Sequence, residues 1–298
     1  NTIYTIDETY WLVVSLKQKK RLAESYRDLV QKLDDDVKKM INEGIATRAA
    51  GLQVDVKVNE AEMAITQVDD GLSLAKMLLC QLCGMPVSSD ITLEDEDSSE
   101  FAVIEETTEY SNETAQNNRT EIKLLENTVD LSRQATKLIR AAYLPHIALT
   151  GGYIVSNPNV YNGFEKKFSG VWNVGIIMHI PVWNWFEGSY KVRASKAATA
   201  MAELEVSDVR EKINLQVAQN QYKLKEAQKR LVTATKNLKN AEENLRCANV
   251  GFREGVMEST EVMTAQTAWQ AAHTQKIDAE IGVKMSQIAL KKALGVLQ

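Results

Sequence analysis

Turn-forming residues are scarce in this chain of 298 residues, which contains 14 glycines and 4 prolines. A many-stranded sheet needs frequent turns, whereas the abundant Ala, Leu, Glu, Lys and Gln favour helices. Hydrophobic residues make up 44% of the chain and charged residues 25%, which is ordinary for a folded protein. The composition therefore predicts long helices.

Cysteine is rare, and basic blocks and long apolar runs are absent. The odd count of Cys80, Cys83 and Cys247 predicts no disulfide framework. Cys80 and Cys83 have the spacing of half a zinc site, but no second pair follows, so we expect both to be buried in an apolar helix end.

The net charge of −5 argues against a nucleic-acid partner. No apolar run reaches about 18 residues, so no transmembrane helix is predicted.

Signatures of catalysis are also absent. The sequence has no HExxH, GxSxG, P-loop or dinucleotide fingerprint. His146, His179 and His273 are scattered, and we expect His273 on a polar helix face. Carboxylates are frequent, but i,i+4 charge pairs on helices account for them. We therefore expect no enzyme activity, no cofactor and no metal site.

An internal repeat organises much of the chain. Gly44 and Gly84 match Gly255 and Gly295, each pair at an offset of 211 residues. Both copies contain a Glu-Gly turn, then a helical stretch, then a closing glycine, which makes a chance match improbable. The sequence therefore predicts two helical hairpins of the same kind.

The helix before the second turn carries a heptad seam. Large and small apolar residues alternate along it, as in closely packed antiparallel coiled coils. Its members are Leu224, Leu231, Leu238 and Leu245, with Ala227, Ala234, Ala241 and Ala248. The offset of 211 gives Leu16, Ala23, Val30 and Val37 in the first repeat. Lys20 and Asp34 interrupt the large row there, so we expect a weaker or partly hydrated seam.

These patterns predict helices over about 6–42, 47–83, 107–141 and 187–249, and from the second turn to about 295. The acidic run Glu94–Asp97 is expected to be a solvated loop. The repeat offset places counterparts of residues 143–185 before residue 1. We therefore expect that an upstream helix and a first strand pair are missing from this sequence.

Two segments between 143 and 185 alternate with a period of two. Each is about ten residues long, the length that a tilted strand needs to cross a bilayer, and the pattern is that of barrel strands. One face holds Ile147, Leu149, Gly151, Tyr153 and Val155, with Trp172, Val174, Ile176, Met178, Ile180 and Val182. The other face holds His146, Ala148, Thr150 and Gly152, with Asn173, Gly175, Ile177 and His179.

A hairpin packed on the helices, or at the edge of a small soluble sheet, is the alternative. Two features favour lipid: the linker SNPNVYNGFEKKFSG is long and polar, and the apolar face is nearly unbroken while the helices keep their own seam. Open strand edges cannot exist in lipid. A barrel would therefore have to be completed by the missing strands and by other copies of the chain.

Several segments carry a resemblance to a known family. RTEIKLLENTVDLSRQATKLIRAAYLPHIALTGGY, IPVWNWFEGSYKVRASKAATA, NLRCANVGFREGVMESTEVMTAQTAW and the closing KKALG resemble the TolC-like outer-membrane efflux proteins. NEAEM and LCQLCGMP resemble a branch from Bacteroides-like bacteria. The resemblance covers nearly the whole chain and allows for the front that we expect to be missing.

The resemblance implies a mainly α fold with a transmembrane β-hairpin, in a homotrimer that shares one twelve-stranded β-barrel. Long antiparallel coiled-coil helices would form an α-barrel tunnel in the periplasm. The domains would be 1–85, a periplasmic helical hairpin; 86–106, a polar equatorial linker; 107–142 with 187–298, the second set of periplasmic helices; and 143–186, the transmembrane hairpin. The partners implied are outer-membrane lipid, a periplasmic adaptor and an inner-membrane pump.

The function implied is an outer-membrane exit duct of a tripartite efflux or type I secretion system, which exports small molecules or proteins passively. Glu261 and Thr264 lie where relatives carry aspartates that control closure, and Ala50 takes the equivalent place in the first repeat. A ring of Glu261 side chains would attract cations. The alternative is a solvated first-turn glutamate, with Ser259 as the N-cap.

Two further groups of residues are expected to contact the adaptor protein and the membrane. The turns Gly44-Ile45-Ala46 and Gly255-Val256-Met257 are candidate contacts for the adaptor, unless Ile45 and Met257 pack inward. Trp172, Trp183, Trp185 and Tyr153 are candidates for the membrane interfaces, with His146 and His179 facing the lumen. A periplasmic adaptor or coiled-coil scaffold is the alternative function.

Overall fold

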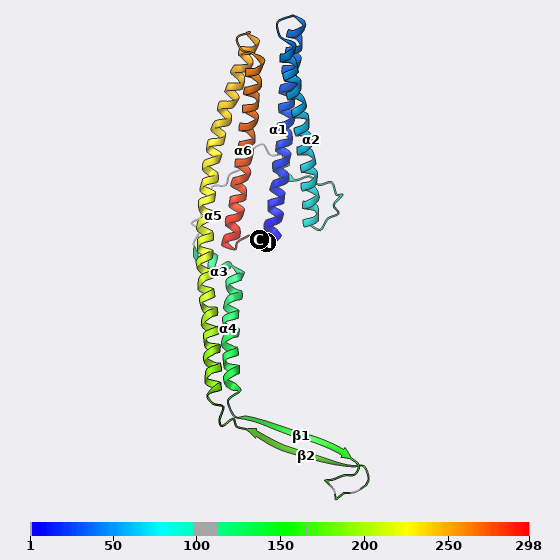
Figure 1. Ribbon diagram of the computed structural model, residues 1–298, viewed down its shortest axis with the longest axis vertical. Coiled ribbons are helices and arrows are strands. Elements are labelled where there is room, and N and C mark those ends of the chain that lie inside the picture. The colour runs from blue at the N-terminus through cyan, green and yellow to red at the C-terminus, as the bar shows by residue number, and fades with distance from the viewer. Residues whose placement is uncertain (1, 98–111, 162, 165, 298) are drawn as a thin grey trace. The chain divides into compact units, whose positions relative to one another are not determined.

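The computed structural model describes residues 2–97, 112–161, 163–164 and 166–297 (Figure 1). They fall into two compact units. The first unit comprises Asn1–Asn118 and Ile213–Gln298, and the second comprises Arg119–Lys212. The 67-residue helix α5 (Glu187–Arg253) contributes to both.

The first unit is built from the two predicted helical hairpins. Helix α1 (Thr2–Asn42) turns into α2 (Arg48–Leu82), and the end of α5 turns into α6 (Ser259–Leu294), as Figure 1 shows. These bounds confirm the predicted helices to within a few residues. The prediction of a helix over 107–141 is only partly right. Residues 98–111 lie outside the described residues, and the rest is α3 (Asn112–Asn118) and α4 (Thr120–Ala141), with Arg119 between them.

The hydrophobic core of the first unit joins all four long helices. It contains Val30 and Val37 of α1, Val54 and Ala61 of α2, Leu245 and Ala248 of α5, and Val262 and Ala265 of α6. The predicted seam residues Val30, Val37, Leu245 and Ala248 are therefore core residues. Complete burial of each valine stabilises the fold by about 1.5–3 kcal/mol.

The repeat holds at the level of individual hydrogen bonds. Gly44, Gly84, Gly255 and Gly295 all have positive φ, between 70° and 75°, as expected just after a helix. The amide of the residue that follows each glycine donates to the carbonyl oxygen five residues earlier in the chain. These bonds are Ile45 N to Met40 O (2.8 Å), Val256 N to Gly251 O (2.9 Å), Met85 N to Cys80 O (2.9 Å) and Val296 N to Lys291 O (3.1 Å).

The two polar residues that interrupt the first seam, Lys20 and Asp34, both form ion pairs. Asp34 is only 2% exposed, and its carboxylate accepts a hydrogen bond from Lys38 Nζ at 2.7 Å. The same Nζ atom lies 3.1 Å from Asp55 of α2, and Lys20 pairs with Asp69 of α2. The interruption that the sequence predicts is real, and charge pairing links α1 to α2 there.

The acidic run Glu94–Asp97 is not a solvated loop, contrary to the prediction. It forms the short 3₁₀ helix η1, which packs on α1 and is linked to α2 through Lys76. The buried Glu96 lies 3.1 Å from Lys76 Nζ, and Tyr10 donates a 2.7 Å hydrogen bond to Asp95. Burial and this hydrogen bond raise the pKa of Tyr10 to about 12. The sequence did not predict that η1 packs on the helices, because its partners Lys76 and Tyr10 are distant in the chain.

Two other predictions of burial were wrong. Cys80 is buried, as predicted, but Cys83 is exposed because it follows the last residue of α2. His273 does not lie on a polar face. It is half-buried, with its ring 5.5 Å from that of Trp269.

Helices α1 and α6 are linked by polar contacts as well as by the core. Gln266, which is 2% exposed, donates from Nε2 to the carbonyl oxygen of Leu29 at 3.2 Å. Lys19 Nζ lies 2.7 Å from Asp278. These contacts determine which side of α1 packs against which side of α6.

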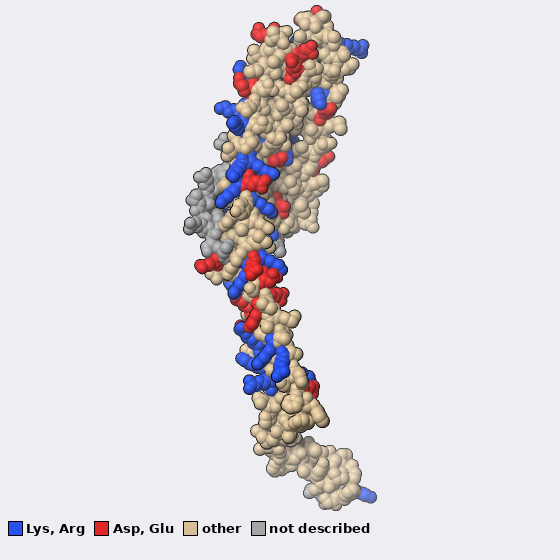
Figure 2. Space-filling model, turned by 60° about the vertical axis from the view of Figure 1, so that its left-hand side comes forward, with Lys and Arg blue, Asp and Glu red and all other residues tan. Residues whose placement is uncertain are grey.

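The second unit pairs α4 with the first part of α5 and carries a strand hairpin. Ser132 lies 2.8 Å from Thr199, and Thr136 lies 2.7 Å from Ser195, through their hydroxyl oxygens. After α4 the chain forms β1 (His146–Ser156) and β2 (Ser169–His179), which pair antiparallel. Figure 2 shows Lys and Arg side chains gathered on the helical part next to the strands. Among the described residues, no helix combines the length and apolarity needed to span a membrane.

The turn glycines predict a stability contrast. Gly255→Ala and Gly44→Ala should each destabilise the fold by about 1–2 kcal/mol, because an L residue with positive φ is strained. Gly282→Ala is the control, since a methyl group there would contact nothing within 4 Å, and it should stabilise by about 0.5–1 kcal/mol. Urea unfolding followed by circular dichroism measures both. Equal urea midpoints for Gly255→Ala and Gly282→Ala would show that the positive φ at Gly255 causes no strain in an alanine.

The burial of His273 predicts a pH dependence of stability. Burial, and then the nearby Lys276, lower the pKa of His273 below its ordinary value of 6.5. The unfolded chain therefore takes up the proton at higher pH than the folded chain. Stability should be fully present above pH 6.5 and should fall as the pH drops through the lowered pKa.

In His273→Gln the loss of stability between about pH 7.5 and pH 5.5 should shrink, because the titrating imidazole is gone. Ala271→Gln, at an exposed position of the same helix, should leave the loss as in the wild type. Urea midpoints across this pH range provide the measurement. An unchanged pH dependence in His273→Gln would show that other groups dominate.

Candidate functional site

The hairpin pairs the two predicted apolar rows with each other. The register sets Ile147 opposite Met178, Leu149 opposite Ile176, Gly151 opposite Val174, and Tyr153 opposite Trp172. Directly opposed residues project from the same face of an antiparallel pair. The two strands therefore share one continuous apolar face, as the alternation predicts.

The other face is small or polar over most of its length. The register sets His146 opposite His179, Thr150 opposite Gly175, and Gly152 opposite Asn173. Thr150 Oγ1 also donates to Gly175 O at 3.2 Å. Two apolar pairs interrupt the polar character of this face, since Ala148 lies opposite Ile177 and Ile154 lies opposite Val171.

The described part of the chain leaves the apolar face of the hairpin uncovered. Leu149 is 76% exposed and Trp172 is 74% exposed. Nearly every strand residue is exposed, and among the described residues no helix packs against the strands. The alternative of a hairpin packed on the helices is therefore wrong for this chain.

Two aromatic groups flank this apolar face. Tyr153 and Trp172 are cross-strand partners near the loop end of the hairpin. Trp183 and Trp185 follow the other end, with ring centroids 5.8 Å apart. The predicted row extended to Val182, but β2 ends at His179, so Ile180 and Val182 are outside the strand. Assignment of the aromatic groups to membrane interfaces stays a prediction.

The two turns that link the long helices lie at the same end of the first unit (Figure 1). Ile45 is 66% exposed and Val256 is 79% exposed, and these two residues are equivalent in the repeat. Ile45 therefore does not pack inward. Met257 does lie against its own hairpin, because a methyl group on Gly251 would come within 2.9 Å of its side chain. The turns present an apolar pair, Ile45 and Val256.

Glu261 and Thr264 are both exposed on the first turns of α6. The N-cap is Glu258 rather than the predicted Ser259, which is buried. The carboxylate of Glu261 accepts a 3.2 Å hydrogen bond from the amide of Glu258, which completes a capping box. Thr264 Oγ1 donates to Thr260 O at 2.8 Å. Glu261 thus has a structural partner, and a gating role stays a prediction.

In the first repeat, the start of the equivalent helix α2 is capped by a different side chain. Thr47 is the N-cap of α2, and its hydroxyl accepts a 3.2 Å hydrogen bond from the amide of Ala50. Ala50 is the equivalent of Glu261 and has no carboxylate to offer. The two turns therefore share their backbone but differ in charge.

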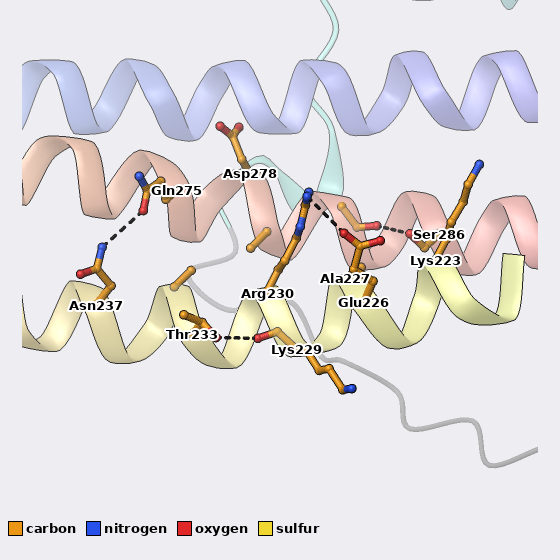
Figure 3. Close-up of a pocket in the computed structure, with 13 residues that line it drawn as sticks. Lys223, Glu226, Ala227, Lys229, Arg230, Thr233, Asn237, Gln275, Asp278 and Ser286 are labelled. Carbon is orange, nitrogen blue, oxygen red and sulfur yellow. Dashed lines mark hydrogen bonds and ion pairs between the residues drawn. The ribbon is translucent and has the colours of Figure 1, made fainter. Parts of the chain in front are cut away.

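A groove of about 790 Å³ runs between α5 and α6 in the first unit (Figure 3). The small seam residues Ala227 and Ala234 face Ala279 and Gly282 across it. Its polar groups are largely satisfied within the chain: Asn237 donates to Gln275 at 3.3 Å, and Arg230 pairs with Glu226 at 3.2 Å. Among the described residues, no group of three or more His, Cys, Asp or Glu could hold a metal ion.

The sequence model described as "Outer membrane efflux protein" matches residues 112–296. No curated protein matches the sequence.

Three solved structures of membrane proteins are similar to the chain. The outer-membrane channel OprN is 15% identical with a TM-score of 0.83, over 99% of this chain and 66% of that one. CusC, described in terms of transmembrane channel formation, is 17% identical with a TM-score of 0.82, over 99% of this chain and 68% of that one. VceC from Vibrio cholerae is 15% identical with a TM-score of 0.78, over 98% and 69%. The chain thus spans less than two thirds of OprN, and the likeness establishes the fold.

Proposed function

The chain belongs to the outer membrane efflux protein family, and we propose that it forms part of a passive exit duct through the bacterial outer membrane. The observation that carries the proposal is the exposed apolar face of the hairpin. Each strand has 11 residues, enough to cross a bilayer when tilted. Lipid is the solvent that such a face needs.

The hairpin also requires further strands. Both of its outer edges carry unpaired backbone groups, which are costly in hydrocarbon. The resemblance to TolC-like proteins implies four strands per chain in a trimer, which would close a twelve-stranded barrel. Our proposal is a homotrimer of the full-length protein, with His146, Asn173 and Gly175 facing the lumen.

The helices offer a second surface for other copies. Leu124, Leu131 and Leu138 recur every seven residues on α4, and all three are exposed in the single chain. A heptad row of leucines normally packs against another helix. Neighbouring copies would cover this row and build the proposed periplasmic tunnel from residues 1–85, 107–142 and 187–298, with 86–106 as an equatorial linker.

The proposed partners are a periplasmic adaptor and an inner-membrane pump. Ile45 and Val256, exposed at the helical turns, would contact the adaptor. The duct would be passive, because the chain shows no catalytic motif and the pump supplies the energy. Exported small molecules or proteins are the substrates that the resemblance implies. A scaffold or adaptor role is less well supported, because it leaves the apolar strand face without a solvent.

Glu261 is the proposed gate residue, together with Thr264. Three copies of Glu261 around a tunnel axis would concentrate negative charge and attract cations. The capping bond to Glu258 uses one carboxylate oxygen and leaves the charge exposed. The structural and gating roles are therefore compatible.

Adjacent residues on opposite faces of β2 test the proposed barrel. Val174→Arg would place a charge on the lipid face and should cost about 2–4 kcal/mol near the bilayer centre. Asn173→Arg, on the lumen face, should assemble normally and change ion selectivity. Heat-resistant trimer on unboiled gels and bilayer conductance are the measurements. If both variants assembled equally, the face assignment would be wrong.

The gate is tested with Glu261→Gln, which keeps an acceptor for the capping bond but removes the charge. Preference for cations over anions, and block by divalent cations, should fall at least about twofold in single-channel recordings. Glu211→Gln on the exposed surface of α5 is the charge-matched control. Recordings indistinguishable from the wild type would eliminate the gate role.

A further inference from the structure

A hollow of about 780 Å³ lies in the second unit, where α4 ends, α5 begins and the chain leaves β2. Helix α4 contributes Lys137 and Arg140 to its lining, and α5 contributes Arg193 and Lys196. The segment after β2 contributes Trp183 and Phe186, and Tyr143 also lines it. Four cations and three aromatic rings therefore converge on one site, and none of the described residues that line it is a carboxylate.

Several other basic residues of the same unit pair with carboxylates, whereas within the described chain the four cations of the hollow do not. Arg133 lies 2.7 Å from Glu203, Arg210 lies 2.7 Å from Glu126, and Lys212 lies 2.6 Å from Asp208. Among the described residues, none of the four side chains in the hollow forms an ion pair or hydrogen bond. The nearest carboxylate in sequence, Glu187, is taken up by Lys191 at 2.5 Å.

The spacing of the cations sets them side by side. Lys137 and Arg140 are three residues apart on α4, and so are Arg193 and Lys196 on α5. Residues three apart share one face of a helix, where like charges repel each other. Figure 2 shows Lys and Arg gathered on this part of the unit. An anion in the hollow would relieve the repulsion.

The hollow is shaped by aromatic packing. The ring of Tyr143 lies so close to α5 that a methyl group on Gly188 would come within 2.9 Å of it. Trp183 packs edge-on against Phe186, with ring centroids 5.7 Å apart. These rings form an apolar rim beside the basic lining, and the exposed apolar hairpin begins next to them.

We propose that this hollow binds the phosphate headgroup of an anionic phospholipid. The guanidinium groups of Arg140 and Arg193 would hold phosphate oxygens in a two-pronged manner, and Lys137 and Lys196 would add point charges. The acyl chains would continue past Trp183 and Phe186 along the apolar face of the strands. A soluble phosphate would satisfy the cations but would leave the aromatic rim unused. This inference rests on the proposed membrane location of the hairpin.

The test uses the full-length protein in detergent and native mass spectrometry. Phosphatidylglycerol and phosphatidylethanolamine with identical acyl chains are the probes, because they differ in headgroup charge. The wild type should retain one phosphatidylglycerol per chain at concentrations where phosphatidylethanolamine is not retained. The variant Lys137→Gln/Arg140→Gln/Arg193→Gln/Lys196→Gln should weaken this binding at least about tenfold.

A charge-matched variant provides the control. Lys212→Gln/Lys225→Gln/Lys236→Gln/Lys239→Gln removes four exposed cations from elsewhere on α5 and should leave the retention of phosphatidylglycerol unchanged. If the fourfold variant of the hollow fails to assemble, the two double variants, one per helix, should each show an intermediate loss. Retention that is equal for the two lipids in the wild type would overturn the proposal.

Two further outcomes would also overturn it. Phosphatidylglycerol retention that survives loss of all four cations would exclude the hollow. Displacement of the lipid by inorganic phosphate at equal concentration would show a soluble-anion site instead. Single-channel recording separates this inference from the proposed function: a wild type that conducts without headgroup preference refutes only the lipid site, whereas a wild type without channels refutes the duct.

Discussion

Packing of large against small side chains between antiparallel helices is the interaction on which the first unit depends. Each long helix has a narrow apolar stripe, and such a stripe gains stability only when a neighbour covers it. The turns at Gly44 and Gly255 reverse the chain within each hairpin, and Val30 of α1 and Leu245 of α5 lie in one core that the two hairpins share. The positive φ of these glycines lets the preceding carbonyls be satisfied by the turn itself.

The strand hairpin differs from the long helices, since no part of the described chain covers its apolar face. Its register aligns apolar residues with apolar residues, and small or polar ones with one another, so the two faces have different preferred surroundings. A basic hollow with an aromatic rim lies where this hairpin joins α4 and α5. Apolar strands, aromatic rings and unpaired cations occur in the order in which a bilayer presents hydrocarbon, interface and phosphate.

Polar side chains are where sequence reasoning failed most. Glu96 was expected in solvent but is buried beside Lys76, and His273 was expected on a polar face but packs on Trp269. Glu258, not Ser259, caps α6, because the chain leaves the preceding turn with Ser259 already in the helix and buried. A charged or polar residue is placed by its partner, and that partner is often distant in the sequence.

The sequence by itself determined the long helices of the two hairpins, the turns at Gly44 and Gly255, the repeat and the alternation of the strands. These follow from local preferences and from periods of seven and two, which are written in neighbouring residues. Only the tertiary structure decided which helices share a core, that η1 docks on α1, and that Lys137, Arg140, Arg193 and Lys196 meet in one hollow. Such convergence depends on how separate helices are set against each other, and no local pattern encodes it.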